Sequence, residues 1–446
     1  MSKIELSEHF TYGKLLRYSL PSIGNILVIT SFQVIDGLFV SNLLGVNPFA
    51  AVNLIYPVVM VLQAVGFMFG AGSSALVSQT LGKGDTEKAR QYFTMSVMVL
   101  VAVSAVLGGL SALLMPWIAR LVGATKDTLP YCIGYGQTLV CFLPAFLINA
   151  AFQTLWITAG KTTLGLCVSI LYGVCNALLD WLFMGLFDWK ITGAALATSL
   201  ASLISASIIL TYFFRPNKSK LRFAPFDMSC LKDLGGMLYN GSSSMVEGIA
   251  GNFTAILTNR QLLRYLGEIG VTAMGVFNFV MAVVMSVFFG ISTTTVSVVG
   301  YKVGQQDRKE IGSILKKDIV LNISLGSAMA VLVTLLSRPV ASLYLGYNAT
   351  ALNTAVTALQ IGSLACLLYG FDIVSSSFFT GLGDGTTSAL IAVVMALAAP
   401  ILTIYALPAL FGSDAIWYAI PCNTFLTAAV CLICLRIRYP KRLATL

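Results

Sequence analysis

Apolar blocks about 20 to 30 residues long, separated by short polar segments, recur along the whole chain. Each block is long enough to cross a bilayer as an α-helix, which takes about 20 residues. A helix also pairs its own backbone groups where no water is present. The pattern predicts an all-α polytopic membrane protein whose twelve transmembrane helices cover residues 14–44, 51–81, 91–115, 128–158, 163–187, 192–214, 232–265, 272–303, 315–336, 350–380, 386–411 and 414–438.

Lysine and arginine are distributed unevenly over the predicted loops. With the N-terminus in the cytoplasm, 21 of the 27 Lys and Arg residues fall on the cytoplasmic side and 6 on the other side. Cytoplasmic loops of membrane proteins carry such an excess. We therefore expect a multi-pass protein of the cell membrane, surrounded by lipid, with both termini in the cytoplasm. The net charge of +9 reflects this topology and does not indicate a nucleic-acid partner.

The remaining composition gives no sign of a cofactor or a structural metal. The nine cysteines are dispersed along the chain. Cys431 and Cys434 have the spacing of metal ligands, but no histidine is near them, since His9 is the only histidine of the sequence. We expect packing roles for the cysteines. The first span follows a charged segment and has no cleavage site of small residues, so we expect it to be retained as a helix.

The second half of the chain repeats the first at an offset of about 222 residues. Leu81-Gly82-Lys83-Gly84-Asp85 corresponds to Val303-Gly304-Gln305-Gln306-Asp307, and four further short matches keep the same order. Each half holds six predicted spans, so both halves have the same orientation in the membrane. Transporters built from such parallel repeats hold substrate between the halves. We expect two six-helix bundles, at 1–214 and 232–446, around a central cavity and joined by a cytoplasmic linker at 215–231.

Embedded acids are the strongest candidates for chemistry. Asp36 is the only charged residue between Tyr18 and Val46, and an ionisable group inside a span is by default a functional hypothesis. Tyr172, Asn176 and Asp180 are four residues apart, so they share one helix face. With Gln33 beside Asp36, these oxygen ligands suit either Na⁺ or a shared proton.

These features resemble the multidrug and toxic compound extrusion (MATE) family over essentially the full chain, and most of all its bacterial MepA-like multidrug efflux branch. The resemblance rests on the twelve spans in two halves, and on Val34-Ile35-Asp36-Gly37, Leu81–Asp85, Asn176 with Leu179-Asp180, Gly193–Thr198 and Asn259–Gly267.

The resemblance implies a secondary transporter, not an enzyme, that exports bulky and often cationic drugs in exchange for H⁺ or Na⁺. The family's first-lobe cation site maps onto Asp36, Asn176, Asp180 and Thr198. It also suggests that Pro21 kinks the first helix in response to protonation of Asp36, and a passive bend is the alternative. The resemblance implies no cofactor beyond the coupling ion, and we expect a monomer.

The second half does not duplicate this site, because the offset places Thr258 opposite Asp36. It carries two other embedded acids, Glu247 and Asp372, which brings the number of acids inside spans to four. They are candidates for a second coupling site or for substrate binding. The alternatives are an ion pair of Glu247 with Arg260 or Arg264, and local packing of Asp372.

Buried acids with abundant aromatic and Met residues favour lipophilic cations as substrates. A lipid-linked oligosaccharide flippase of the same superfamily is the nearest alternative, but its anionic cargo calls for several Lys or Arg residues in the cavity. An intramembrane aspartyl protease is a more distant alternative, because Gly381-Leu382-Gly383-Asp384 matches its GxGD motif. The repeat indicates that this motif is an inter-helix turn. A phosphate-binding Gly-Lys-Ser/Thr loop in its proper context is absent from the sequence, which excludes an ATP-driven pump.

Overall fold

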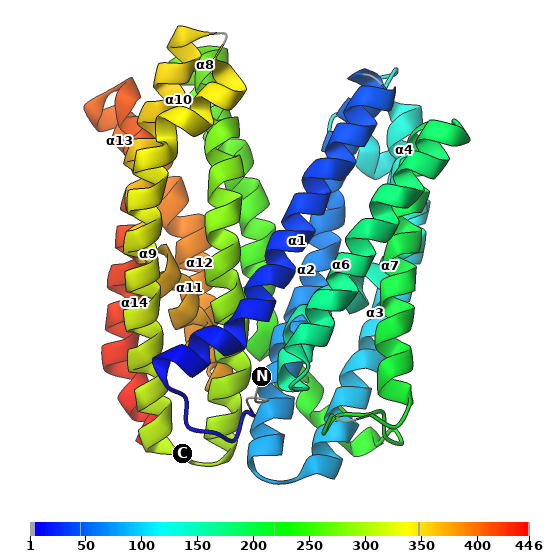
Figure 1. Cartoon of the computed structure of the whole chain (residues 1–446), viewed down its shortest axis with the longest axis vertical. Helices are drawn as coiled ribbons and strands as arrows, with labels where there is room; N and C mark the ends of the chain where they lie inside the picture. Colours follow the sequence, from blue (N-terminus) through cyan, green and yellow to red (C-terminus); the bar gives the residue numbers. More distant parts are fainter. Residues whose placement is uncertain (1–4, 45, 218, 347, 445–446) are drawn as a thin grey trace.

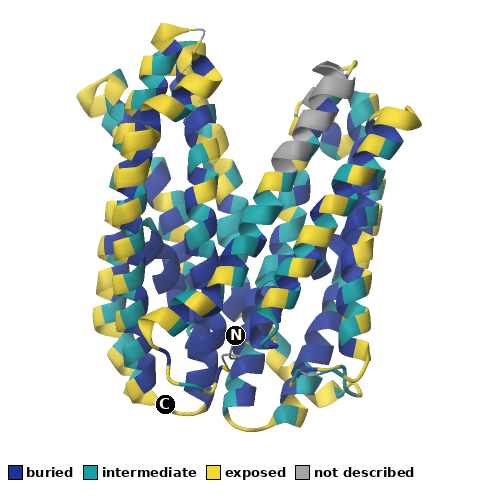
Figure 2. Ribbon diagram, viewed as in Figure 1, coloured by how far each residue is buried: buried dark blue, intermediate teal, exposed yellow. Residues whose placement is uncertain are grey.

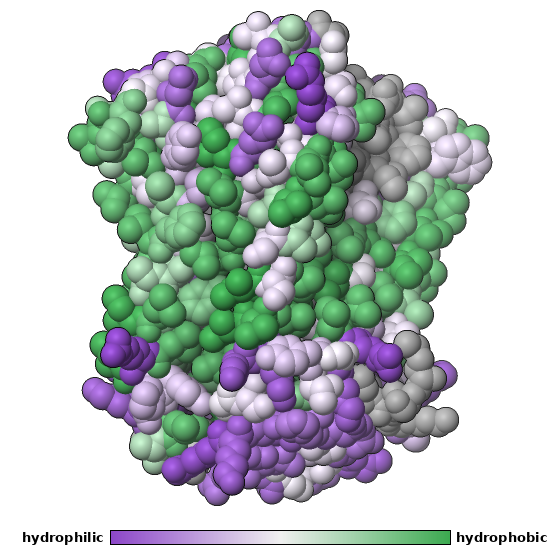
Figure 3. All heavy atoms as spheres, turned by 60° about the vertical axis from the view of Figure 1, so that its left-hand side comes forward, coloured by the Kyte–Doolittle hydropathy of each residue, from purple (hydrophilic) through white to green (hydrophobic). Residues whose placement is uncertain are grey.

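The computed structural model describes residues 5–44, 46–217, 219–346 and 348–444, and several side chains between Gln33 and Ala50 lie outside the described set. Two helical lobes stand side by side (Figure 1). They are close together at the end of the molecule where both termini lie, which we call the terminal end, and apart at the opposite end. On the face shown in Figure 3, an apolar band runs across the molecule between two polar ends.

The first lobe contains seven α-helices and one π-helical turn among the described residues: α1 (Tyr12–Leu44), α2 (Val46–Gly82), α3 (Thr86–Leu121), α4 (Leu129–Cys141), α5 (Leu143–Thr158), α6 (Thr162–Asp180), the π-helix η1 (Trp181–Leu186) and α7 (Lys190–Phe214).

The second lobe contains, within the described ranges, η2 (Met228–Asp233), α8 (Leu234–Gly304), α9 (Arg308–Leu345), α10 (Ala349–Gly362), η3 (Ser363–Ala365), α11 (Cys366–Gly381), α12 (Gly385–Val393), the π-helix η4 (Val394–Ala398), α13 (Ala399–Phe411), η5 (Ser413–Tyr418) and α14 (Ala419–Ala444).

The twelve predicted spans are present, although several are joined or broken. α8 runs for 71 residues and contains two spans, which are separated by a kink at Gly267, where φ is 64°. Glycine tolerates this left-handed conformation without a steric cost. The fourth span is bent by 62° between α4 and α5. Nine helices of the described residues are long and apolar enough to cross a membrane. Counting α8 as two spans and adding the bent pair α4–α5 and α1 gives the predicted twelve.

The irregularities repeat between the lobes. The break between α4 and α5 at Phe142 corresponds to η3, the break between α10 and α11. The fifth span of each half contains a π-helical stretch, η1 after α6 and η4 after α12. Asp85 and Asp307 also correspond, because each caps the following helix by accepting a hydrogen bond from a first-turn backbone N–H. The duplication therefore extends to the local geometry.

Two glycines of the repeated motif lie where the lobes meet. A methyl group on Gly82 of α2 would overlap the carbonyl oxygen of Tyr301, and one on Gly304 of α8 would overlap the carbonyl oxygen of Gln79. Nearby, the hydroxyl groups of Ser74, Thr158 and Ser297 bond one another at 2.7 to 3.1 Å. Buried residues are concentrated in this region in Figure 2. The terminal end is thus closed by direct backbone contact.

The segment before α1 crosses from the first lobe to the second. Phe10 is fully buried, and its backbone N–H donates to Glu310 Oε1 of α9 at 2.9 Å. His9 Nδ1 lies 2.6 Å from the other oxygen of Glu310, and Lys302 Nζ donates to the carbonyl oxygen of Ser7 at 3.0 Å. This segment adds a second contact between the lobes at the terminal end.

The GxGD sequence forms a turn, as the repeat predicts. Gly383 has a φ of 75°, and Asp384 caps α12 by accepting from the backbone N–H of Thr387 at 3.2 Å and from its hydroxyl at 2.7 Å. Because the Asp384 carboxylate caps a helix, we assign it a structural role and not that of the catalytic acid of a protease.

Candidate functional site

Two acids from different helices meet inside the first lobe. α1 packs along α6, which brings Asp36 next to Asp180, the last residue of α6 before the π-helical turn η1. Asp180 is fully buried. Three of the four carboxyl oxygens, both of Asp180 and one of Asp36, make no hydrogen bond of normal geometry. Buried acceptors without partners are rare in proteins, so a proton or a small cation fits between these carboxyl groups.

An amide and a hydroxyl group complete this cluster. Asn176 lies one turn before Asp180 on α6, and its Nδ2 donates to Oγ1 of Thr198 on α7 at 3.3 Å. The Thr198 hydroxyl group in turn donates to the carbonyl oxygen of Ala194 at 3.1 Å. The Asn176 side-chain oxygen is of the type that hard cations bind.

A small cavity lies against the cluster. It has a volume of about 70 Å³, and it is lined by Asp36, Asn176, Thr198 and three tyrosines, Tyr56, Tyr135 and Tyr172. This space admits a few water molecules or one ion, and it is smaller than the several hundred Å³ of a drug-sized pocket. The site therefore suits an ion rather than a drug.

A second cavity of about 140 Å³ has four lining residues in common with the first, including Gln63 and Tyr172. Its polar walls include Asn149, whose Nδ2 donates to the carbonyl oxygen of Ser202 at 3.0 Å and whose Oδ1 accepts from Ser205 at 2.5 Å. The interior of the first lobe is thus polar beyond the acid pair.

The structure brings together most of the residues expected at this site: Asp36, Tyr172, Asn176, Asp180 and Thr198. The side chain of Gln33 lies outside the described residues. Pro21 lies inside α1 without ending it, and it lines a separate pocket near the terminal end. Sequence analysis missed Tyr56, Tyr135 and Gln63. Tyr172 was identified by its four-residue spacing from Asn176 and Asp180 on one helix, and these three residues lie on other helices, α2 and α4.

Glu247 occupies a different environment in the second lobe. It accepts a hydrogen bond from Ser376 Oγ at 3.1 Å, and it lines a cavity of about 270 Å³ with Met, Phe, Tyr and Trp side chains. The alternative pairing with Arg260 or Arg264 is wrong, because neither arginine forms an ion pair with it in the described part of the chain. No Lys or Arg lines the cavity.

Asp372 is fully buried in α11, and neither of its carboxyl oxygens has a hydrogen bond of normal geometry. The Cys431 thiol of α14 lies beside it. Tyr369 is within electrostatic reach of both Asp372 and Glu247. Asp372 does not line the cavity that contains Glu247, so the two acids have different surroundings.

A fifth acid within the predicted spans corrects the expectation of four. Asp318 in α9 is fully buried. Its Oδ2 accepts from Thr295 Oγ1 of α8 at 2.9 Å, and its Oδ1 has no hydrogen-bond partner. Asn322, one turn later, is also fully buried with an unpartnered side-chain oxygen. The predicted span 315–336 contains Asp318 but the residue was overlooked there, and α9 extends this helix back to Arg308.

Comparison with known proteins agrees with this architecture. The MatE family model matches residues 21–182 and again residues 244–405, once in each half. The multidrug export protein MepA of Staphylococcus aureus (strain MSSA476) is 20% identical over 440 residues, covering 96% of this chain and 94% of its own length. The probable multidrug resistance protein YoeA of Bacillus subtilis (strain 168) is 25% identical over 371 residues, covering 81% and 77%.

Solved structures show the same fold. A crystal structure of MATE in complex with MaL6 superimposes with a TM-score of 0.92 at 20% identity, covering 99% of both chains. An outward-facing multidrug resistance MATE transporter of the MOP superfamily superimposes with a TM-score of 0.91 at 21% identity, also over 99% of both chains. Since the family model covers well over half of the sequence, this chain belongs to the MATE family.

Proposed function

We propose that this protein is a secondary active multidrug efflux transporter that exchanges H⁺ or Na⁺ for lipophilic, mostly cationic compounds. The observation that carries the proposal is the contact between Asp36 and Asp180, with three unpartnered oxygens, beside an ion-sized cavity. Two carboxyl groups in contact favour the uptake of one proton or one cation. An efflux role is also consistent with the names of the two relatives above, a multidrug export protein and a probable multidrug resistance protein.

In this mechanism the ion site and the drug site are in different lobes. A proton or Na⁺ binds at Asp36, Asp180, Asn176 and Thr198, and its binding favours one arrangement of the two lobes over the other. The second-lobe cavity, with Glu247 and its Met and aromatic walls, offers charge attraction and adaptable packing to a lipophilic cation. Rocking of the lobes then exposes each site alternately to the two sides of the membrane.

The proposed setting is the cell membrane, with both termini in the cytoplasm, because the excess of Lys and Arg lies on that side. The terminal end is then the cytoplasmic end, and its closed state corresponds to an outward-facing transporter. We propose a monomer that needs no cofactor beyond the coupling ion.

An oligosaccharide flippase is disfavoured, because the second-lobe cavity has an acid and no Lys or Arg in its lining. A pyrophosphate-linked cargo requires positive charge there.

Proteoliposomes test the proposal. The purified protein is reconstituted with a cationic dye, and a proton gradient and a sodium gradient are imposed separately. Dye movement driven by either gradient supports exchange and identifies the ion. Absence of movement under both gradients, with the protein folded and inserted, contradicts the proposal.

A further inference from the structure

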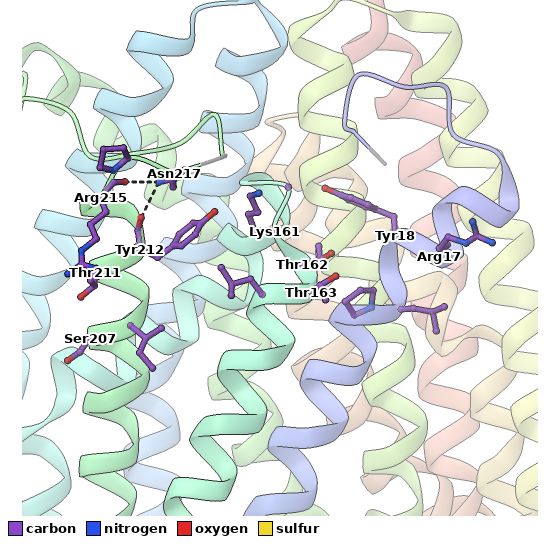
Figure 4. A pocket seen from close by; sticks show the side chains of 16 residues that line it. Arg17, Tyr18, Lys161, Thr162, Thr163, Ser207, Thr211, Tyr212, Arg215 and Asn217 are labelled. Carbon is purple, nitrogen blue, oxygen red and sulfur yellow. Dashed lines mark hydrogen bonds between the residues drawn. The ribbon is translucent and has the colours of Figure 1, made fainter. Parts of the chain in front are cut away.

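The largest pocket described here, about 1140 Å³, lies on the first lobe near the cytoplasmic end and is distinct from the two sites above. Its walls come from four segments: the start of α1, the start of α6, the end of α7 and the beginning of the linker. Figure 4 shows Tyr18 and Arg17 on one side, Arg215 and Asn217 on the other side, and Lys161 between them.

The pocket is basic. Arg17, Lys161 and Arg215 line it, and its lining contains no Asp or Glu. Neither arginine takes part in an ion pair of the described structure, and both are exposed. Three cations around one cavity without an acid make a site for an anion.

Neutral hydrogen-bond donors surround these cations. The hydroxyl groups of Thr162, Thr163, Thr211 and Tyr212 belong to the lining. α6, a helix of 19 residues, also begins here, and its N-cap residue makes no side-chain capping bond to the first-turn N–H groups. Free amides at a helix N-terminus, together with the helix dipole, favour phosphate oxygens.

Part of the wall is apolar. Leu20, Pro21, Leu164 and Ile208 line the same pocket as the three cations, and Leu20 is 55% exposed. A soluble anion gains nothing from such a surface, whereas a ligand with a charged head and an apolar body contacts both parts. The positive charge also disfavours the lipophilic cations proposed as substrates.

We propose that this pocket binds the phosphate headgroup of an anionic phospholipid from the cytoplasmic leaflet, with the acyl chains against Leu20 and Ile208. Basic pockets between helices on the cytoplasmic side of membrane proteins bind such headgroups. The bound lipid bridges α1, which carries Asp36, to the beginning of the inter-lobe linker. This inference does not depend on the proposed transport activity.

The test is the binding of fluorescent phosphatidylglycerol to the purified full-length protein in neutral detergent. Each cation near an anionic lipid contributes about 1 kcal/mol, or about fivefold in affinity. We expect the triple variant Arg17→Ala/Lys161→Ala/Arg215→Ala to bind about 100-fold more weakly than the wild type. The matched control Lys83→Ala/Lys309→Ala/Lys316→Ala removes three exposed cations outside the pocket and should bind like the wild type.

Further arms identify the ligand. Phosphatidylcholine and free glycerol phosphate should compete at least tenfold more weakly than phosphatidylglycerol. If glycerol phosphate competes as well as the lipid, the pocket is a soluble-phosphate site and the proposal is wrong. It is also wrong if the triple variant binds like the wild type, or if the control loses as much affinity. Should the triple variant fail to fold, Arg17→Gln/Arg215→Gln changes two exposed side chains, with an expected loss of about 25-fold.

Discussion

Carboxyl groups buried without a cationic partner are the main residue-scale feature of this protein. Asp180, Asp318 and Asp372 are fully buried, and each has at least one carboxyl oxygen without a hydrogen bond. None takes part in an ion pair of the described structure. Because an uncompensated buried charge is costly, each of these positions favours a bound proton or cation.

We predict that Asp36→Asn abolishes ion-coupled export and leaves the protein folded. Asparagine keeps the shape of the side chain and cannot titrate. Cells that express equal amounts of the wild type and the variant are compared for resistance to ethidium-like cations. Undiminished resistance in the variant would remove Asp36 from the coupling site.

We predict that Asp180→Asn has a similar effect, and that the Asp36→Asn/Asp180→Asn double variant is scarcely worse than either single one. The two carboxyl groups are in contact, and residues that act as one site are not additive. The measurement is the initial rate of transport in liposomes under a fixed ion gradient. If the loss of transport rate in the double variant equals the product of the losses in the two single variants, the two acids act in different steps of transport.

We predict that Glu247→Gln raises the apparent KM for a cationic dye by about tenfold, which corresponds to about 1.4 kcal/mol of lost charge attraction. The KM for a neutral dye should change little, because a neutral dye is not attracted by the charge of Glu247. Both dyes are measured in liposomes under one ion gradient. Equal loss of transport for both dyes would place Glu247 in the coupling site.

At the scale of elements, hydropathy predicted the number and order of the spans, and the repeat predicted the turn at Asp384. The π-helical stretches η1 and η4 were not predicted, because they break no apolar pattern and contain no proline. The start of α9 was also missed. Arg308, Lys309, Lys316 and Lys317 suggested a loop, but this basic segment is helical, so Asp318 lies about three turns inside α9.

The acid cluster was predictable for a different reason. Asn176 and Asp180 are four residues apart on one helix, so their common face follows from helical geometry alone. Tyr56 and Tyr135 come from α2 and α4, and only tertiary packing brings them to Asp36.

The glycine contact between α2 and α8 gives an element-scale prediction. Gly82→Ala places a methyl group on the backbone of α8, and such overpacking costs about 1 to 3 kcal/mol. We expect the lobes to separate at the terminal end, which is measured as a longer distance between spin labels at Lys83 and Lys309. Gly109→Ala is the control, because a methyl group there meets no atom within 4 Å. An unchanged distance in Gly82→Ala would show that this contact does not hold the lobes together.

At the scale of the whole molecule, the closed end depends also on the contact of the N-terminal segment with the second lobe. The segment before α1 docks on α9 through Glu310, which is 6% exposed. Since a hydrogen bond to a charged group contributes about 1.5 to 3 kcal/mol, we expect Glu310→Gln to shift the population toward a state in which the terminal end is open. The same spin-label pair reports the shift, and the exposed Glu268→Gln is the control. Equal distance distributions in the two variants would contradict this role.

The contacts of the two glycines are reciprocal. Gly82 meets Tyr301 and Gly304 meets Gln79, and the offset of 222 residues relates Gly82 to Gly304 and Gln79 to Tyr301. In an isologous homodimer interface, residue i of one subunit contacts residue j of the other, and residue j of the first contacts residue i of the second. The contacts between the two halves follow this pattern. The fold is therefore, in its geometry, a twofold dimer carried on one polypeptide. Because both halves are encoded separately along one chain, they can differ where two copies of an identical subunit cannot, and Asp36 indeed corresponds to Thr258 at the equivalent position.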